Sequence, residues 1–423
     1  MLQKVSLFQE KKDLFIAFFI LAFISFYSLL MEYNNYINLT KFDSQIINTT
    51  LLKQYSKTKV TKNGKSKSYQ VLKLKTSQGA LFYTSSKNLS LRVGAHLQLE
   101  VWAGKISFYE YMRSFYAFSK ILREEKLIDL KQELNLSIQK QHLQNNIAAI
   151  YQALYTAKQL SKELQQKFSS LGISHLVAIS GFHLGVLSAL LFFLFKKPYQ
   201  ILQNRFFPYR SYKVDSFVLI IFLLFAYMLF LDTPASLLRA FSMLFIGFIL
   251  YDRGIQLLSM QTLFITTLLL LALFPRLIFS LGFGLSIGGV FYILLFLIHF
   301  KHLSKLWQFF LLPVWVYLMM LPYSLIIFGN FSFYHPLSIV WSTLFTIFYP
   351  LSIFLHLINQ GDFLDIVILK LTQMNNRSIV LDISTLYLLP TLILSFLGLF
   401  WRKFLFVLLL NSLIFLTYSY LKL

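Results

Sequence analysis

Long apolar segments recur along this chain of 423 residues, and they restrict its fold more than any other feature. The first is LFIAFFILAFISFYSLLM at Leu14–Met31, and similar runs follow one another from Ile173 to Tyr418. A helix of about 20 apolar residues crosses the ~30 Å hydrocarbon core of a bilayer. Hydrophobic residues make up 57% of the chain and charged residues 13%, against roughly 45–50% and 25% in soluble domains. The sequence therefore predicts a polytopic helical membrane protein and excludes a soluble globular fold.

About ten membrane spans are predicted from these runs. In chain order they are Leu14–Met31, Ile173–Phe195, Phe217–Leu231, Ser236–Leu250, Leu257–Phe274, Leu281–Ile298, Leu306–Phe328, Leu337–Leu357, Ile379–Leu399 and Phe404–Tyr418. Lysines precede the first span, and Lys196–Lys213 is a basic loop after the second. Because cytoplasmic loops carry an excess of Lys and Arg, the N-terminus and this loop are predicted to be cytoplasmic and residues 33–172 extracytoplasmic. Alternation then puts Arg402 and Lys403 outside, against the same rule.

The chain divides by composition into four parts. They are an N-terminal transmembrane anchor at 1–37, a β domain at 38–128, an amphipathic helical segment at 129–172 and a polytopic domain at 173–423. The helical segment contains one predicted helix, Asn145–Ser169, with an apolar stripe and a cap at Gly172. A stripe of this kind lies along the membrane interface or packs on the spanning bundle.

Residues 38–128 contain no run of membrane length and are predicted to form a small β-barrel or sandwich. Short β-type stretches occur at Ser68–Thr76, Ala80–Thr84 and Ala95–Trp102, and Asn63-Gly64 is a hairpin-turn signal. Between residues 53 and 105 there are ten Lys and one Arg against one acidic residue. Such a surface binds a polyanion or lies against anionic lipid headgroups.

If the polyanion is a nucleic acid strand, lysines would contact phosphates and aromatic rings would stack on bases. The candidates are Lys57, Lys59, Lys62, Lys65, Lys67, Lys73 and Lys75 for phosphates, and Tyr69, Phe82, Tyr83 and Trp102 for bases.

The second span opens with an unusual polar sequence, HLVAISGFHLG at His175–Gly185. Polar side chains in a span are costly and usually face a cavity or a partner. Gly181 and Gly185 form a small-residue stripe that lets another helix approach closely. Ser180 and His183 are three residues apart, so they share a face of the helix. These residues are either a packing face with locally bonded polar groups or part of a functional site.

Two later segments also combine polar and small residues. In DTPASLLRA, Asp232, Ser236 and Arg239 are predicted to fall near one face of a helix. Arg239 lies inside the span, so it snorkels, pairs with an acid such as Asp232, or lines a wet path. In GFGLSIGG, Gly282–Gly289, four glycines and a serine indicate close helix packing or a broken helix beside a cavity.

These segments, with Arg253 and the loop FGNFSFYHP at Phe328–Pro336, resemble in order the competence domain of the ComEC family of bacterial DNA-uptake channels. The family pattern is similar to H-L-x-A-I-S-G-h-H-h-G, a Pro/Ser…R-A motif, a cytoplasmic Arg, G-F-x-L-S and F-G-x-F-S. The matching residues are His175, Ser180, Gly181, His183, Gly185, Pro234, Ser236, Arg239, Ala240, Arg253, Gly282, Phe283, Leu285, Ser286, Phe328, Gly329, Phe331 and Ser332. The resemblance covers roughly residues 150–400.

The resemblance implies an all-α polytopic membrane bundle with a small extracytoplasmic all-β, OB-like domain. It implies a channel of the bacterial inner membrane that passes single-stranded DNA into the cytoplasm during natural transformation, with the outer domain binding the strand. The resemblance implies that the transport path would be formed by His175, Ser180, Gly181, His183, Gly185, Asp232, Ser236, Arg239, Arg253, Gly282, Phe283, Ser286, Phe331 and Ser332. The implied partners are single-stranded DNA, a periplasmic DNA receptor, a cytoplasmic ATP-driven motor or single-strand-binding proteins, a separate nuclease, the lipid bilayer and a second copy of the chain.

No enzymatic activity, cofactor or metal site is expected. Many family members end in a metallo-β-lactamase-like domain, but no His-x-His-x-Asp-His string occurs here, so a nuclease would be another protein. No G-x-x-x-x-G-K-[ST] string occurs, and the absence of cysteine excludes thiolate chemistry. Two alternatives stay open: an intramembrane serine hydrolase that uses Ser180 with His183 or His175, and a small-solute or lipid transporter.

Overall fold

The computed structural model describes residues 10–60, 66–86, 94–125, 130–252, 259–374 and 377–423. These residues form two compact units. The sheet unit consists of Glu10–Gln132 and Leu268–Ser280, and the helical unit consists of Glu133–Thr267 and Leu281–Leu423. The predicted turn Asn63-Gly64 and the candidate residues Lys62, Lys65 and Arg253 lie outside the described residues.

The sheet unit begins with the long apolar helix α1, Lys11–Thr40, which confirms the predicted N-terminal apolar helix. Its other elements are β1 Gln45–Val60, β2 Ser66–Thr76, β3 Leu81–Ser86, β4 His96–Trp102, α2 Phe108–Arg113, β5 Phe115–Tyr116, β6 Phe118–Glu125 and the 3-10 helix η1 Pro275–Phe279. The predicted stretches at 68–76, 80–84 and 95–102 correspond to β2, β3 and β4.

The strands form one curved sheet in the order β5-β3-β2-β1-β4-β6. All pairs are antiparallel except β3 with β5. The chain runs from β5 directly into β6, and Ser119 of β6 donates a hydrogen bond to Thr84 of β3 at 2.9 Å. The two edges of the sheet therefore meet, and the strands enclose a core. Alternate residues fill that core, as expected for strands with one buried face: Leu72, Leu74, Phe82, Leu97 and Leu99.

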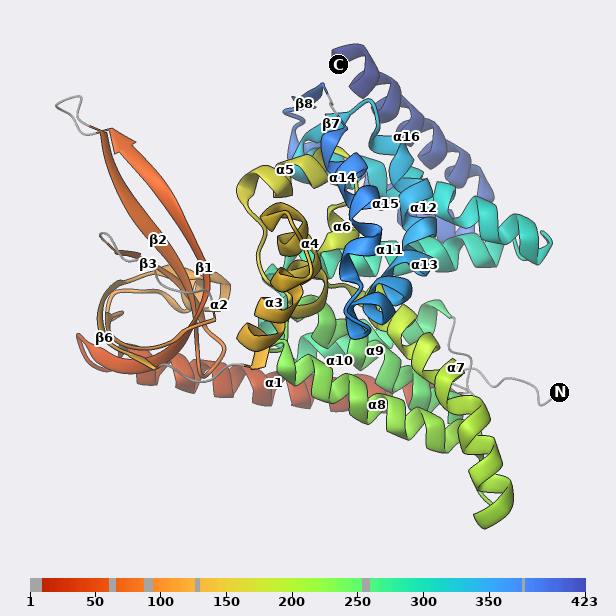
Figure 1. Cartoon of the computed structure of the whole chain (residues 1–423), viewed down its shortest axis with the longest axis horizontal. Coiled ribbons are helices and arrows are strands. Elements are labelled where there is room, and N and C mark those ends of the chain that lie inside the picture. The colour runs from red at the N-terminus through yellow and green to blue at the C-terminus, as the bar shows by residue number, and fades with distance from the viewer. Residues whose placement is uncertain (1–9, 61–65, 87–93, 126–129, 253–258, 375–376) are drawn as a thin grey trace. The chain divides into compact units, whose positions relative to one another are not determined.

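The strands β1 and β2 are longer than their neighbours. β3 pairs only with residues 70–75 of β2, and β4 only with residues 45–50 of β1. The remaining pairs continue to Val60 opposite Ser66, and among the described residues no third strand pairs with them. These residues form a two-stranded arm that extends from the barrel (Figure 1).

The helical unit contains most of the predicted spans. Its helices are α3 Leu130–Lys140, α4 Asn145–Thr156, α5 Lys162–Ser170, α6 Ser174–Val177, α7 Gly181–Phe206, α8 Tyr212–Phe230, α9 Ala235–Asp252, α10 Met260–Leu273 (shared with the sheet unit), α11 Leu281–His299, α12 Lys305–Phe328, η2 His335–Leu337, α13 Ser338–Leu357, η3 Gly361–Leu364, α14 Asp365–Gln373, η4 Thr385–Tyr387, α15 Leu388–Phe400 and α16 Arg402–Lys422. Two short strands, β7 Asn330–Ser332 and β8 Ser378–Val380, pair antiparallel.

Seven helices in the described residues are long and apolar enough to cross a membrane: α1, α7, α8, α11, α12, α13 with η2, and α16. Three shorter apolar helices lie at Leu237–Leu250, Met260–Leu273 and Thr385–Phe400. The seven long helices and the three shorter ones overlap the ten predicted spans. Whether the three shorter helices also cross the bilayer stays a prediction.

Two predicted helices have different boundaries in the structure. The helix expected over Asn145–Ser169 is split into α4 and α5, because Ala157 adopts a left-handed conformation with φ 58° after α4. Most of α4 is buried in a core shared with α13 and α14, so this part packs on the bundle, as the second of the two sequence interpretations allowed. The helix predicted from Ile173 begins at Gly181, after the short α6.

Candidate functional site

The sequence HLVAISGFHLG contains the beginning of α7. Ser180 is the N-cap residue, and its backbone N–H donates to Nδ1 of His183 at 3.3 Å while its hydroxyl lies 3.1 Å from the same atom. This is a capping box in which a histidine takes the place of the usual Glu or Gln. The ring of His183 is buried against Phe345 and Tyr349 of α13. Ser180 and His183 therefore meet, as predicted, and fix where α7 starts.

Next to the cap, α7 packs closely on α9. A Cβ at Gly181 would lie 3.1 Å from Cβ of Ala240, so this position has little room for a larger side chain. Gly185 has nothing within 4 Å of its Cβ position. The predicted close approach of another helix is confirmed at Gly181, whereas Gly185 takes no part in it.

The neighbouring residue of α9, Arg239, is only 4% exposed. Its Nη1 donates a 2.8 Å hydrogen bond to the Gly282 carbonyl, and its guanidinium lies 5.8 Å from the ring centre of Phe283. Its Nε is buried without a hydrogen-bond partner among the described residues. An unsatisfied donor on a buried cation leaves this site able to accept an anion.

The predicted face of Asp232, Ser236 and Arg239 does not exist. Asp232 has φ 60° and lies before α9, in the turn that follows α8, so it has no place on the helix that carries the other two residues. The hydrogen bond of Arg239 goes to a backbone carbonyl of α11 and not to a carboxylate. The side chain of Ser236 lies outside the described part of the structure, and Ser286 is half-buried on α11.

The loop FGNFSFYHP supports the turn that precedes α6. The Ser332 hydroxyl donates to the Ser170 carbonyl at 2.7 Å, and the ring of Phe331 stacks on His335 at 5.2 Å. Gly172 has φ 71°, and a Cβ there would lie 2.9 Å from the His335 ring, so only glycine fits this turn. Phe331 and Ser332 are fully buried. In this conformation both side chains support the backbone of the turn that precedes α6, and their place in a transport path stays a prediction.

His175 lies on α6, and its Nε2 is 3.2 Å from the Ser342 hydroxyl of α13. The side chain is exposed, yet desolvation by the surrounding protein lowers its pKa from the ordinary value. Among the matching motif residues, His175 is thus both polar and accessible.

In the sheet unit, one outer face combines basic and aromatic residues. Lys57 stands opposite Tyr69 on the arm, and Lys73 stands opposite Tyr83 with its Nζ 5.7 Å from that ring centre. Trp102 is 42% exposed on another strand. Lys75 is half-buried, and the side chains of Lys59 and Lys67 lie outside the described part of the structure.

Phe82 was predicted to stack on bases, and this prediction is wrong. Its side chain is fully buried in the barrel core and stacks on Phe115. Phe82 and Tyr83 are adjacent on β3, and successive residues of a strand point to opposite faces. A base can therefore reach Tyr83 but not Phe82.

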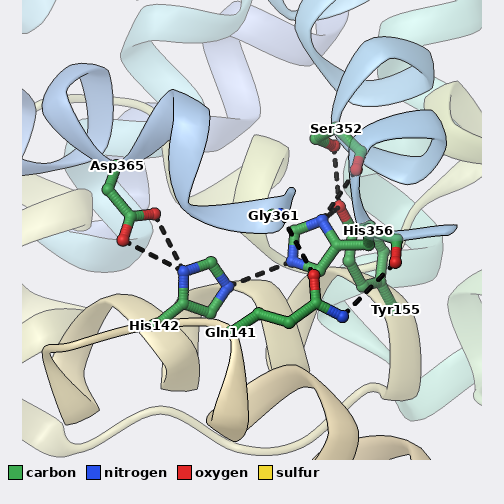
Figure 2. Close-up of polar contacts among 7 residues, drawn as sticks. All are labelled: Gln141, His142, Tyr155, Ser352, His356, Gly361 and Asp365. Atoms are coloured by element: carbon green, nitrogen blue, oxygen red, sulfur yellow. Dashed lines mark hydrogen bonds and ion pairs between the residues drawn. The ribbon is translucent and has the colours of Figure 1, made fainter. Parts of the chain in front are cut away.

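The sequence interpretation missed two clusters of charged residues. In the sheet unit, Arg276 of η1 pairs with Glu32 of α1 at 2.6 Å and lies over the Tyr111 ring at 4.6 Å. In the helical unit, His142 contacts both Asp365 and His356 (Figure 2). The sequence held one signal for the first cluster: Glu32 and Arg276 are isolated charges next to long apolar runs. The second joins residues more than 200 positions apart, and no local pattern marks it.

Comparison with known families finds a match to the competence protein family over residues 155–423, which is more than half of the chain. No curated protein and no solved structure matches. The matched region contains the cap of α7, Arg239 of α9 and the glycine-rich start of α11. The chain therefore belongs to the competence family of ComEC type and is a membrane protein of DNA uptake.

Proposed function

We propose that this chain forms a passage for single-stranded DNA across the bacterial inner membrane into the cytoplasm, and that it acts as a channel and not as an enzyme. The observation that carries the proposal is the convergence of three motif segments around Arg239 and Ala240. Gly181 of α7 approaches Ala240, and the Gly282 carbonyl of α11 accepts from Arg239. Residues of α7 and α11 thus contact two adjacent residues of α9, one of which is a buried cation.

Arg239 is the residue best suited to act on the phosphate backbone in this passage. Within the described residues, it keeps a guanidinium inside the helical unit with no carboxylate bonded to it and with its Nε lacking a hydrogen-bond partner. Arg presents several donors in a planar fork that matches phosphate oxygens. In the described conformation Arg239 is buried. Movement of α9 relative to α11 would expose it, so the resting conformation is closed at this point.

The sheet unit would capture the strand before it enters. A five-stranded, partly open barrel is the form of an OB-fold, whose sheet face binds oligonucleotides. The meeting of β3 with β5 and of β4 with β6 supports an OB-like barrel here. Basic residues along the arm, with Tyr69 and Tyr83, would hold a strand through phosphate contacts and stacking, without reading its sequence.

The proposed orientation has the N-terminus in the cytoplasm and residues 33–172 outside. The pairing of β7 with β8 supports a different number of membrane crossings after α12 from that obtained by simple alternation. The pairing brings residues 378–380 back to residues 330–332, so both segments lie on the same side of the membrane. Helices α13 and α14 then form a hairpin that starts and ends on one side. This moves Arg402, at the start of α16, to the cytoplasmic side, in agreement with the positive-inside rule.

A serine hydrolase is the second candidate, because Ser180 and His183 lie 3.1 Å apart. A catalytic base is normally oriented by a third group. Here Nε2 of His183 is buried and makes no hydrogen bond within the described residues. The pair is accounted for by its role as a helix cap. Labelling of Ser180 by a covalent serine probe would favour the hydrolase.

The channel proposal is tested with a photo-crosslinking amino acid placed in the full-length protein. At His175, an exposed residue of α6 just before the cap of α7, it should crosslink to DNA halted during uptake. The matched control is Phe222 on α8, a large side chain that is 67% exposed and belongs to none of the motif segments. DNA crosslinked at Phe222 but not at His175, or at neither position while DNA is being taken up, would contradict the proposed path.

A further inference from the structure

The strongest unexplained feature is a chain of polar contacts that joins the turn after α3 to the corner between α13 and α14 (Figure 2). Nδ1 of His142 lies 2.9 and 3.0 Å from the two carboxylate oxygens of Asp365. Nε2 of His142 lies 3.0 Å from Nε2 of His356, and Nδ1 of His356 lies 2.7 Å from the Ser352 carbonyl. None of these residues belongs to the motif segments.

The hydrogens of this chain can be assigned by counting donors and acceptors. A carbonyl only accepts, so Nδ1 of His356 carries a hydrogen, and Nε2 of neutral His356 is a lone pair. The facing Nε2 of His142 must then carry a hydrogen as well. Its Nδ1 either donates to ionised Asp365, which makes His142 an imidazolium, or accepts from protonated Asp365. If the proton sits on His356 instead, the count is the same.

Every arrangement that satisfies the contacts therefore contains one proton more than an ionised Asp365 with two neutral histidines. Without that proton, either two imidazole lone pairs face each other at 3.0 Å, or Nδ1 of His356 turns its lone pair to the Ser352 carbonyl at 2.7 Å, with the Tyr155 hydroxyl at 3.3 Å as its donor. We propose that Asp365, His142 and His356 form a proton-binding site, and that the bound proton fastens the α3–α4 corner to the α13–α14 corner. The site as a whole is then neutral.

The surroundings favour retention of this proton. The His142 side chain is fully buried, and that of Asp365 is 20% exposed, so exchange with solvent takes place at the Asp365 end. Burial raises the pKa of Asp365 from its ordinary value, against the opposing effect of its bond to His142, and the neighbouring Asp362 raises it further.

The other titratable groups around the imidazoles are neutral tyrosines. From α4, Tyr151 stacks on His142 at 4.6 Å, and Tyr155 meets His356 edge to face at 5.1 Å. Burial raises the pKa of both tyrosines, so neither becomes charged at neutral pH. The Tyr155 hydroxyl donates to Ser352 at 2.8 Å and continues the chain into α13.

A metal ion fits this site less well than a proton. Two imidazoles whose Nδ1 atoms are bonded to a carboxylate and a carbonyl resemble metal ligands. However, the described residues contain no group of three or more side chains arranged to hold a metal ion. Gly361 also lies directly against one of the two facing nitrogens: a Cβ there would be 2.8 Å from Nε2 of His356. The space that further ligands would need is filled by backbone.

The test is hydrogen–deuterium exchange of the full-length protein in lipid nanodiscs, read in the peptide that contains Gly361. The Gly361 amide donates to Gln141 of the α3 corner at 3.0 Å, so it reports whether the corners are joined. After correction for the intrinsic exchange rate, the protection factor of the Gly361 amide should fall as the pH rises over the range in which the site formed by Asp365, His142 and His356 loses its proton. Because opening releases one proton, the fall approaches tenfold per pH unit.

Two variants separate a bound proton from a plain ion pair. In Asp365→Asn the amide can donate to Nδ1 of His142, so the contacts are kept without an extra proton, and protection should stay high and independent of pH. The matched control, Asp362→Asn, removes an exposed carboxylate three residues away. It should keep a pH-dependent protection whose midpoint lies at lower pH than in the wild type, because Asp362 no longer raises the pKa of Asp365. A second variant, His142→Gln, should lower protection at every pH and abolish its pH dependence.

Three results would overturn the proposal. The first is wild-type protection that does not change between pH 5.5 and 8.5. The second is a pH dependence that survives in both Asp365→Asn and His142→Gln, since the proton would then be held elsewhere. The third is loss of protection on treatment with EDTA at constant pH, which would show that a metal joins the imidazoles.

Discussion

Replacing Arg239 with alanine should stop DNA entry into the cytoplasm while leaving a folded, inserted protein. The substitution removes one hydrogen bond from a charged group, about 1.5–3 kcal/mol, and one cation–π contact with Phe283, about 0.5–2 kcal/mol. It also removes the cost of holding an arginine inside a membrane helix, about 2.5–3.5 kcal/mol. These terms nearly cancel, because the guanidinium has a carbonyl and not a carboxylate as its partner.

The assay follows labelled DNA separately to the outside of the cytoplasmic membrane and into the cytoplasm, with protein level measured in the same cells. Arg239→Ala should leave the first signal and the protein level unchanged and abolish the second. Arg239→Lys keeps the charge but loses the planar fork, so part of the entry should remain.

The control is Arg276, a half-buried arginine that is paired with Glu32. Removal of one partner leaves the other charge uncompensated, at a cost below the about 3–5 kcal/mol of a fully buried pair, because both side chains are 17% exposed. Arg276→Ala should therefore lower the protein level, unlike Arg239→Ala. Normal cytoplasmic DNA entry in well-expressed Arg239→Ala cells would refute a role for this charge in the passage.

Three further predictions test other parts of the structure. Gly181→Leu should separate α7 from α9 and impair uptake, whereas Gly185→Leu, with open space at its Cβ, should be tolerated in a transformation assay. Tyr83→Ala should weaken binding of single-stranded DNA by the full-length protein by about 1–3 kcal/mol, whereas Phe82→Ala should destabilise the barrel by about 3–5 kcal/mol in thermal unfolding; equal effects on binding would contradict the assigned faces. A cysteine at Lys57 should react with an impermeant maleimide in spheroplasts and one at Asn204 should not, and the reverse would overturn the orientation.

The sequence was most informative where a structure depends on a local pattern. The apolar runs predicted ten helices because membrane length and hydrophobicity are local properties. Strands β2, β3 and β4 were predictable from short β-type stretches bounded by turn signals. The strand β1 was missed, since a bulge between Leu51 and Lys53 interrupts the alternation that marks a strand. The break after α4 was missed because its left-handed residue is an alanine and not a glycine.

The candidate site was predictable in its residues and not in their partners. The depth of Arg239 followed from its position within an apolar run, but its acceptor, Gly282, depends on how α9 meets α11. The exposure of Tyr83 and the burial of Phe82 depend on which face of β3 is inside the barrel, and neighbouring residues gave no reason to choose. The contact of His142 with Asp365 and His356 requires the α13–α14 hairpin to fold back on α4, which no local sequence pattern encodes.

Deletion of the gene, scored for labelled DNA at both sides of the cytoplasmic membrane, tests the central claim most directly. If this chain forms the passage, the deletion strain should still bring DNA to the outer face of that membrane, and no labelled strand should reach the cytoplasm until the wild-type gene is restored. Labelled DNA in the cytoplasm of the deletion strain at the wild-type rate would contradict the account.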